Sequence, residues 1–143
     1  MSGKKLTCLE CGQLNRVPFE KLTAGPKCGT CGAQLVGGKV AEVDLATLEK
    51  AARNDDLPIV VDFWAPWCGP CRQMAPQYQA AAGELAGQVR LVKLNTEDHP
   101  NAGAKYRIRG IPTMAAFANG KERARQSGAM PSQAIVNWVK ANT

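Results

Sequence analysis

The chain has 143 residues, with 18 Lys and Arg against 12 Asp and Glu, so its formal net charge is +6. That length suits one ordinary domain plus a small module, and the composition is typical of a globular protein. No segment approaches the length of a membrane span, and the N-terminus lacks the apolar core of a signal peptide. We therefore expect a cytoplasmic protein that does not enter the membrane.

The six cysteines form three Cys-x-x-Cys pairs. Secreted domains use cysteines as a disulfide framework, whereas paired cysteines in a reducing compartment serve metal binding and redox chemistry. The pairing therefore agrees with a cytoplasmic location.

The first two pairs, Cys8-x-x-Cys11 and Cys28-x-x-Cys31, are separated by sixteen residues, and each pair is followed by glycine. This spacing predicts two knuckle turns whose four thiolates hold one Zn²⁺ in a closed tetrahedral site. A closed site indicates a structural metal that supplies much of the folding energy of so short a ribbon. A second redox pair and an iron site remain alternatives.

Residues 1–39 hold six basic and two acidic residues, which is +4 of the total charge of +6. A basic module can bind nucleic acid. However, this module has no basic run and no cluster of aromatic residues for stacking. We therefore favour ordinary solubility and expect no nucleic-acid partner.

We expect a zinc ribbon over residues 1–36, a glycine-containing linker at 37–39 and a second domain over 40–143. Hydrophobic periodicity, caps and turn signals predict the elements of that domain. Asp44 or Thr47 is expected to cap the first helix, and Asn119-Gly120 favours a type I′ hairpin turn. The β-α-β-α-β-α-β-β-α order indicates an α/β sandwich around a mixed sheet. We expect strands at 40–43, 58–65, 89–95, 113–117 and 123–126, and helices at about 44–54, 68–85, 100–106 and 132–141.

The third pair lies in Trp67-Cys68-Gly69-Pro70-Cys71, between an apolar strand and a helix. Free N–H groups and the helix dipole at such a junction favour a thiolate. We expect Cys68 to be the exposed nucleophile and Cys71 the more buried resolving thiol of dithiol–disulfide exchange. Pro70 removes an N–H near the sulfurs, and Trp67 offers an apolar contact surface. Half of a zinc site and a structural disulfide are the alternatives.

Asp62 is an acid within an otherwise apolar strand. An unpaired buried carboxylate should have a raised pKa, and such a group can take and return the proton of Cys71. The alternative is an acid at an edge or on the surface.

The segment from Val61 to Cys71, together with Ile111-Pro112-Thr113, closely resembles thioredoxin. The resemblance covers residues 40–143, and the whole chain resembles the zinc-containing bacterial branch of that family. It implies the thioredoxin fold, preceded by a small zinc ribbon. It also implies a redox-active disulfide between Cys68 and Cys71.

The resemblance assigns further roles to residues that stand in this sequence. Lys93 matches the partner of the buried acid, Asp62. Ile111-Pro112 matches a loop with a cis peptide bond that faces the dithiol, and Gly128 lies in a third loop that faces the substrate. The implied catalytic residues are thus Cys68, Cys71, Asp62 and Lys93, and the implied substrate-binding residues are Trp67, Gly69, Pro70, Ile111, Pro112 and Gly128.

Membership of the family implies a protein-disulfide reductase that acts on disulfide-containing proteins and is recharged by NADPH-dependent thioredoxin reductase. Because the chain has no nucleotide-binding fingerprint, we expect it to bind no nucleotide itself. We expect a monomer. Two alternatives remain open: the ribbon is a docking or chaperone arm beside an accessory redox domain, or it is a redox sensor that releases zinc on oxidation.

Overall fold

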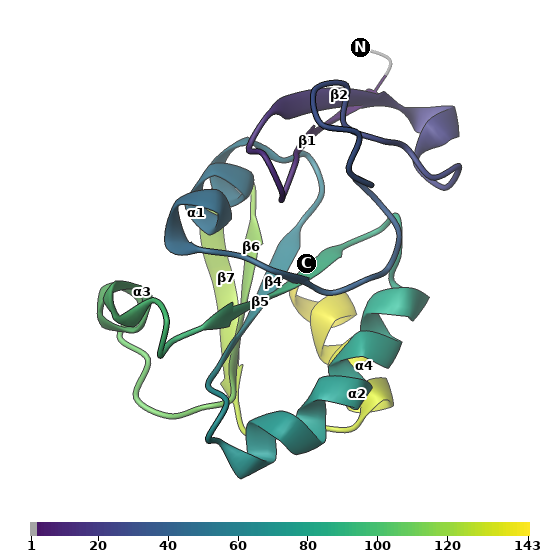
Figure 1. Ribbon diagram of the computed structural model, residues 1–143. Coiled ribbons are helices and arrows are strands. Elements are labelled where there is room, and N and C mark those ends of the chain that lie inside the picture. Colours follow the sequence, from purple (N-terminus) through teal and green to yellow (C-terminus); the bar gives the residue numbers. More distant parts are fainter. Residues whose placement is uncertain (1–2) are drawn as a thin grey trace.

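The computed structural model describes residues 3–143, which form two separate sheets (Figure 1). The N-terminal ribbon contains an antiparallel pair of strands followed by a short 3-10 helix. The second sheet has five strands in the order β3-β5-β4-β6-β7. Helices lie on both of its faces. The ribbon comprises β1 (Gly3–Thr7), β2 (Leu14–Pro18) and η1 (Phe19–Lys21); the remaining elements are β3 (Ala41–Glu42), α1 (Leu45–Asn54), β4 (Ile59–Trp64), α2 (Gly69–Glu84), β5 (Arg90–Asn95), α3 (Pro100–Lys105), β6 (Thr113–Ala118), β7 (Lys121–Ser127) and α4 (Ser132–Asn142).

The five-stranded sheet is mixed, as the order of the elements predicts. Strands β3, β4 and β5 are parallel, and β6 and β7 add antiparallel strands on the other side of β4. Val60 of β4 packs against α2 and α4, while Val61 and Phe63 pack against α1 and α3 on the opposite face. Because both faces are covered, β4 is a nearly continuous apolar strand.

The predicted turns and caps are confirmed. The Asp44 carboxylate accepts a hydrogen bond from the N–H of Thr47 at 2.8 Å and so caps α1. Asn119 and Gly120 both have positive φ, as a type I′ hairpin turn requires. Strand β3 is shorter than expected, because the N–H of Val40 donates to the side chain of Gln79 rather than to a strand.

Within residues 3–143, no helix is both long and apolar enough to cross a membrane.

A buried ion pair joins the ribbon to the second domain. One guanidinium nitrogen of Arg90 lies 2.6 Å from a carboxylate oxygen of Asp55 and 2.8 Å from the carbonyl oxygen of Thr7. The other donates to the carbonyl oxygen of Leu35, and the second oxygen of Asp55 accepts from the N–H of Thr7. The pair therefore satisfies backbone groups at both ends of the ribbon.

The segment that precedes β4 is also part of the ribbon's core. Leu57 packs in one buried cluster with Leu6, Leu35 and two of the ribbon cysteines. Beside it, Lys5 and Asp56 exchange two hydrogen bonds: the N–H of Lys5 donates to the Asp56 carboxylate, and the N–H of Asp56 donates to the Lys5 carbonyl. The ribbon thus lies at the start of β4.

We predict that Arg90→Ala destabilises the protein by about 3–5 kcal/mol, the usual effect of removing one partner from a buried pair. The side chains of Arg90 and Asp55 are only 6% and 1% exposed, and burial already raises the pKa of Asp55 despite the guanidinium. Urea unfolding measures the effect. Arg123→Ala, on the exposed strand β7, is the matched control and should change stability by less than about 0.5 kcal/mol. Equal losses of stability in the two variants would contradict a stabilising role for the Arg90–Asp55 ion pair.

Candidate active site and metal centre

Cys68 and Cys71 form a disulfide where β4 passes into α2. Cys68 is the N-cap residue, and the N–H of Cys71 points at its sulfur from 3.2 Å. Pro70 occupies the first turn, where the missing N–H costs the helix nothing. A thiolate on Cys68 would therefore face an N–H donor and the positive end of the helix dipole.

The expectation that Cys68 is exposed is wrong for this oxidised arrangement. Cys68 is 5% exposed and Cys71 is 2% exposed, so the two are buried almost equally. The reason is that the sulfur of Cys68 is bonded to its partner and lies 3.7 Å from the carbonyl oxygen of Ile111. The next residue back, Trp67, is 67% exposed and presents its ring to solvent.

Two loops from distant parts of the chain meet beside the disulfide. The Ile111–Pro112 peptide bond is cis, as the resemblance implied. The carbonyl of Pro112 accepts a hydrogen bond from the N–H of Gly128 at 2.9 Å, and Gly128 has a φ of +98° that favours glycine. Gly69 is half-buried and Pro70 is exposed. The predicted substrate-binding residues therefore surround the dithiol.

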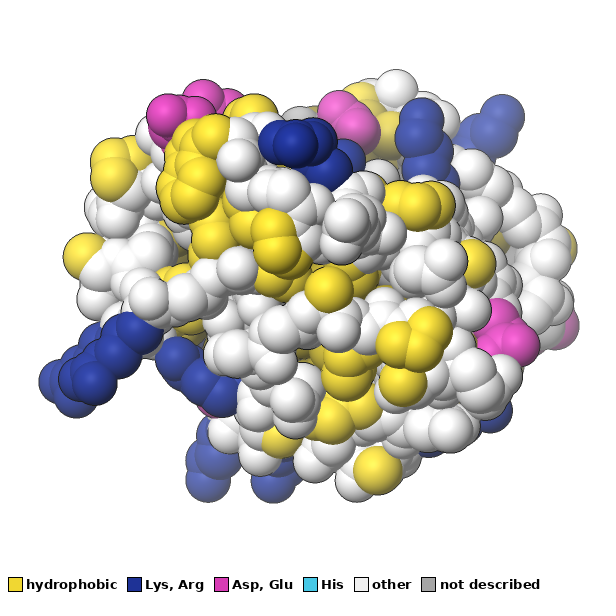
Figure 2. Space-filling model, turned by 90° about the horizontal axis from the view of Figure 1, so that it is seen from below, with side chains coloured by type: hydrophobic (Ala, Val, Ile, Leu, Met, Phe, Trp, Pro, Cys, Tyr) yellow, Lys and Arg dark blue, Asp and Glu magenta, His cyan; other side chains and the backbone are white. Residues whose placement is uncertain are grey.

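The end of the molecule at which α2 begins carries several apolar patches separated by polar side chains and backbone (Figure 2). Apolar side chains gather across its centre, and Lys and Arg side chains project mainly from its edges. Trp67, one of the two large apolar side chains exposed within residues 3–143, belongs to this end because it adjoins Cys68. Such a surface suits contact with a protein segment rather than with a small charged ligand.

Asp62 is 4% exposed and lies on β4 two residues after Val60, so its side chain points to the face that α2 covers. One carboxylate oxygen has no hydrogen-bond partner among the described residues. Burial, opposed by the charge of Lys93 and assisted by that of Glu42, raises the pKa of Asp62 to about 7. The predicted buried acid is therefore present beneath the helix that carries Cys71.

Lys93 is aligned with Asp62 in the ladder between β4 and β5. No ion pair joins the two in the part of the chain that the structure describes, and the Lys93 ammonium instead lies 5.2 Å from the centre of the Trp64 ring. Sequence reasoning missed Glu42, which accepts a hydrogen bond from the Trp64 indole at 3.2 Å. Nothing in the sequence around Glu42 distinguishes it from a surface acid.

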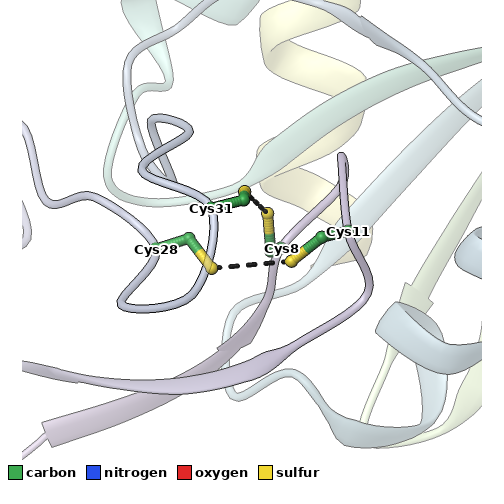
Figure 3. Close-up of side chains that lie close together, drawn as sticks. All are labelled: Cys8, Cys11, Cys28 and Cys31. Carbon is green, nitrogen blue, oxygen red and sulfur yellow. Dashed lines mark hydrogen bonds between the residues drawn. The ribbon is translucent and has the colours of Figure 1, made fainter.

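The other four cysteines form a compact cluster (Figure 3). Their sulfurs point toward one another from two loops, and all lie within 4.8 Å of one another. The sulfurs of Cys8 and Cys31 are 3.6 Å apart, and those of Cys11 and Cys28 are 3.7 Å apart. A tetrahedral site with Zn–S bonds of about 2.3 Å has sulfurs about 3.8 Å apart, so the arrangement fits a four-coordinate metal.

The knuckle turns support the cluster. The glycine after each cysteine pair has positive φ, +83° at Gly12 and +79° at Gly32, as the sequence predicted. The sulfur of Cys28 accepts hydrogen bonds from the N–H of Thr30 and from the side chain of Asn15. These donors stabilise a thiolate and orient the ligand.

Comparison with known proteins agrees with this geometry. The family model described as Thioredoxin matches residues 39–141, and that described as Thioredoxin 2, N-terminal matches residues 7–33. Thioredoxin C-3 of Corynebacterium nephridii is 37% identical over 94% of this chain and 92% of its own length. The chloroplastic M-type thioredoxin of Chlamydomonas reinhardtii is 41% identical over 87% of this chain and 91% of its own length. The crystal structure of chloroplastic thioredoxin z superposes with a TM-score of 0.67 at 31% identity and covers 72% of this chain and 93% of its own.

The chain belongs to the thioredoxin family. It combines the thioredoxin fold and dithiol with an N-terminal ribbon that is compatible with metal binding. Its activity is that of the family, protein-disulfide oxidoreduction, and thioredoxins generally work with thioredoxin reductase and disulfide substrates.

We predict that Asp62→Asn stabilises the oxidised protein by roughly 4 kcal/mol at pH 8, because the pKa of Asp62 rises from 3.8 to about 7 on folding. The native state then binds more protons than the unfolded state between those values. The Asp62 contribution to stability is therefore lost as the pH rises from about 4 to about 7. Urea unfolding of the wild type and of Asp62→Asn across this range should show that the difference between their free energies of unfolding disappears below pH 4. A difference in stability that does not depend on pH would contradict a raised pKa.

Proposed function

We propose that Cys68 and Cys71 carry out the reduction in two steps. The Cys68 thiolate attacks a substrate disulfide, forms a mixed disulfide and releases one substrate thiolate. The Cys71 thiolate then attacks Cys68, which releases the second substrate thiolate and closes the Cys68–Cys71 disulfide. The substrate gains two electrons, and the protein loses two. The placement of this disulfide at the N-terminus of α2 carries the proposal.

Asp62 is proposed as the group that takes the proton of Cys71 in the second step. Its support is a pKa near the working pH, an unpaired oxygen and a position on the sheet face under α2. Lys93 is proposed to tune that pKa through its charge, since it lowers the pKa of Asp62 without touching it. The proposed catalytic set is therefore the one the sequence predicted.

A substrate segment is proposed to lie across the cis-proline loop in an extended conformation, with backbone groups pairing as in strand addition. Support comes from the exposed Trp67 and from the proximity of the Ile111 carbonyl to Cys68. The proposed contact residues are Trp67, Gly69, Pro70, Ile111, Pro112 and Gly128.

The metal is proposed to be one structural Zn²⁺ per chain, held by Cys8, Cys11, Cys28 and Cys31. A set of four thiolates suits Zn²⁺, leaves no open position for catalysis and contributes folding energy to the ribbon. Four unpaired cysteines also require a reducing compartment, which supports the cytoplasm.

We further propose that the chain divides into a ribbon at 1–36, a linker at 37–39 and a thioredoxin domain at 40–143. The protein is proposed to act as a monomer, with NADPH-dependent thioredoxin reductase as its electron donor.

We predict that the chain accelerates the reduction of insulin by dithiothreitol and that Cys68→Ser returns the rate to background, because no nucleophile remains. Cys71→Ser should instead accumulate a mixed disulfide with the substrate, since the resolving thiol is missing. Mass spectrometry of the intact protein detects that adduct. The double variant Cys68→Ser/Cys71→Ser is the matched control: it lacks the resolving thiol and also the nucleophile, leaves the ribbon cysteines intact and should show no such adduct. Full activity in Cys68→Ser would refute the mechanism.

We predict one zinc per chain in the reduced protein, retained during stepwise peroxide treatment until the Cys68 and Cys71 thiols have been oxidised. Zinc analysis and thiol counting in parallel measure this order. Coordination to zinc protects the ribbon thiolates from oxidation by peroxide, and the closed cluster leaves no open coordination position on the metal. Release of zinc at low peroxide with loss of four further thiols would instead make the ribbon a sensor, and protein purified without zinc would overturn the metal assignment.

A further inference from the structure

The ribbon carries a groove that the disulfide chemistry does not use. Its volume is about 420 Å³, and it lies between β2 with η1 on one side and the loop from Ala24 to Lys27 on the other. Val17 and Leu35 form its apolar floor, and both belong to the buried cluster of the ribbon. The groove is therefore a fixed feature of the ribbon.

The charges around this groove have one sign. Arg16, Lys21 and Lys27 line it, all three are exposed, and no Asp or Glu is among its lining residues. No salt bridge engages any of the three within residues 3–143. An uncompensated group of cations along a narrow groove attracts an anionic partner and favours its association.

One wall of the groove is the free edge of β2. Lys5, opposite Arg16 in the β1–β2 ladder, directs its own N–H and carbonyl away from β2 to Asp56. In antiparallel pairing, two residues that face each other either exchange both hydrogen bonds or both point outward. Arg16 therefore presents its N–H and carbonyl outward, where an extended peptide can accept and donate hydrogen bonds.

We propose that this groove docks an extended acidic segment of a partner protein. The backbone of the segment pairs with Arg16, its carboxylates face Arg16, Lys21 and Lys27, and a small apolar side chain packs over the Val17–Leu35 floor. The lining contains no aromatic residue on which a base would stack, so the groove favours a peptide over a single-stranded nucleic acid.

The groove and the dithiol lie at opposite ends of β4. Leu57, two residues before the strand, packs in the ribbon, whereas Cys68 follows its far end. Six strand residues span about 20 Å. A partner held in the groove therefore leaves the dithiol free, and the docking does not depend on the reductase mechanism.

The test is fluorescence anisotropy of a labelled peptide, Glu-Val-Glu-Val-Glu-Val, added to the full zinc-loaded chain at low ionic strength. The double variant Arg16→Glu/Lys21→Glu should bind at least about tenfold more weakly, because two attractive pairings become repulsive. Lys121→Glu/Arg123→Glu makes the same change of charge on the exposed edge strand β7 and should bind as the wild type does. The milder Lys21→Ala should bind more weakly than the wild type while retaining the zinc and the insulin reduction of the wild type.

Three results would overturn the proposal. The first is no binding of the acidic peptide by the wild type. The second is an equal loss of peptide affinity in the two double variants, which would show that the peptide is attracted by the net charge of the protein alone. The third is tighter binding of a labelled oligothymidylate than of the peptide, which would make the groove a nucleic-acid site. Because insulin reduction is measured separately, failure of the docking and failure of the reductase mechanism are distinguishable.

Discussion

The burial of β4 on both faces is the constraint on which the rest of the molecule depends. The strand lies between β5 and β6 with helices above and below, so its side chains have no access to water except near its ends. An acid in its middle must then sit in a medium that disfavours its charge, which explains the raised pKa of Asp62. The same rigidity fixes the position of Cys68 at one end and of Leu57 at the other.

The chain uses the Cys-x-x-Cys spacing for two different chemistries, and the surroundings decide which. In the ribbon, two knuckle turns bring four sulfurs within 4.8 Å of one another, so each sulfur has three like neighbours, and a metal cation would stabilise all four as thiolates. At the start of α2, one pair stands alone, and its N-terminal sulfur faces a helix N–H. The clusters are about a strand length apart, too far for disulfide exchange within one folded chain.

The sequence predicted what short-range patterns encode, namely the order of elements, the knuckle glycines, the hairpin turn at Asn119 and the strand-to-helix position of Cys68. It did not predict the buried Arg90–Asp55 ion pair, because Arg90 contacts a residue 35 positions away and another 83 positions away, and no local pattern signals such contacts. The exposure of Cys68 was also wrong, because the covering Ile111 carbonyl comes from a loop 43 residues further on. Periodicity describes one element at a time, whereas these contacts arise from how elements assemble.

The shared core between the ribbon and the thioredoxin domain argues against a freely moving arm. A ribbon of this size buries little apolar surface, and part of what it buries is Leu57 from the other domain. The Arg90 guanidinium then needs the Thr7 and Leu35 carbonyls as well as Asp55 to satisfy its donors. Removing the ribbon would leave this buried cation with one partner and expose Leu57 at the start of β4. Each part therefore depends on the other for stability, although the dithiol reacts at the far end of the strand.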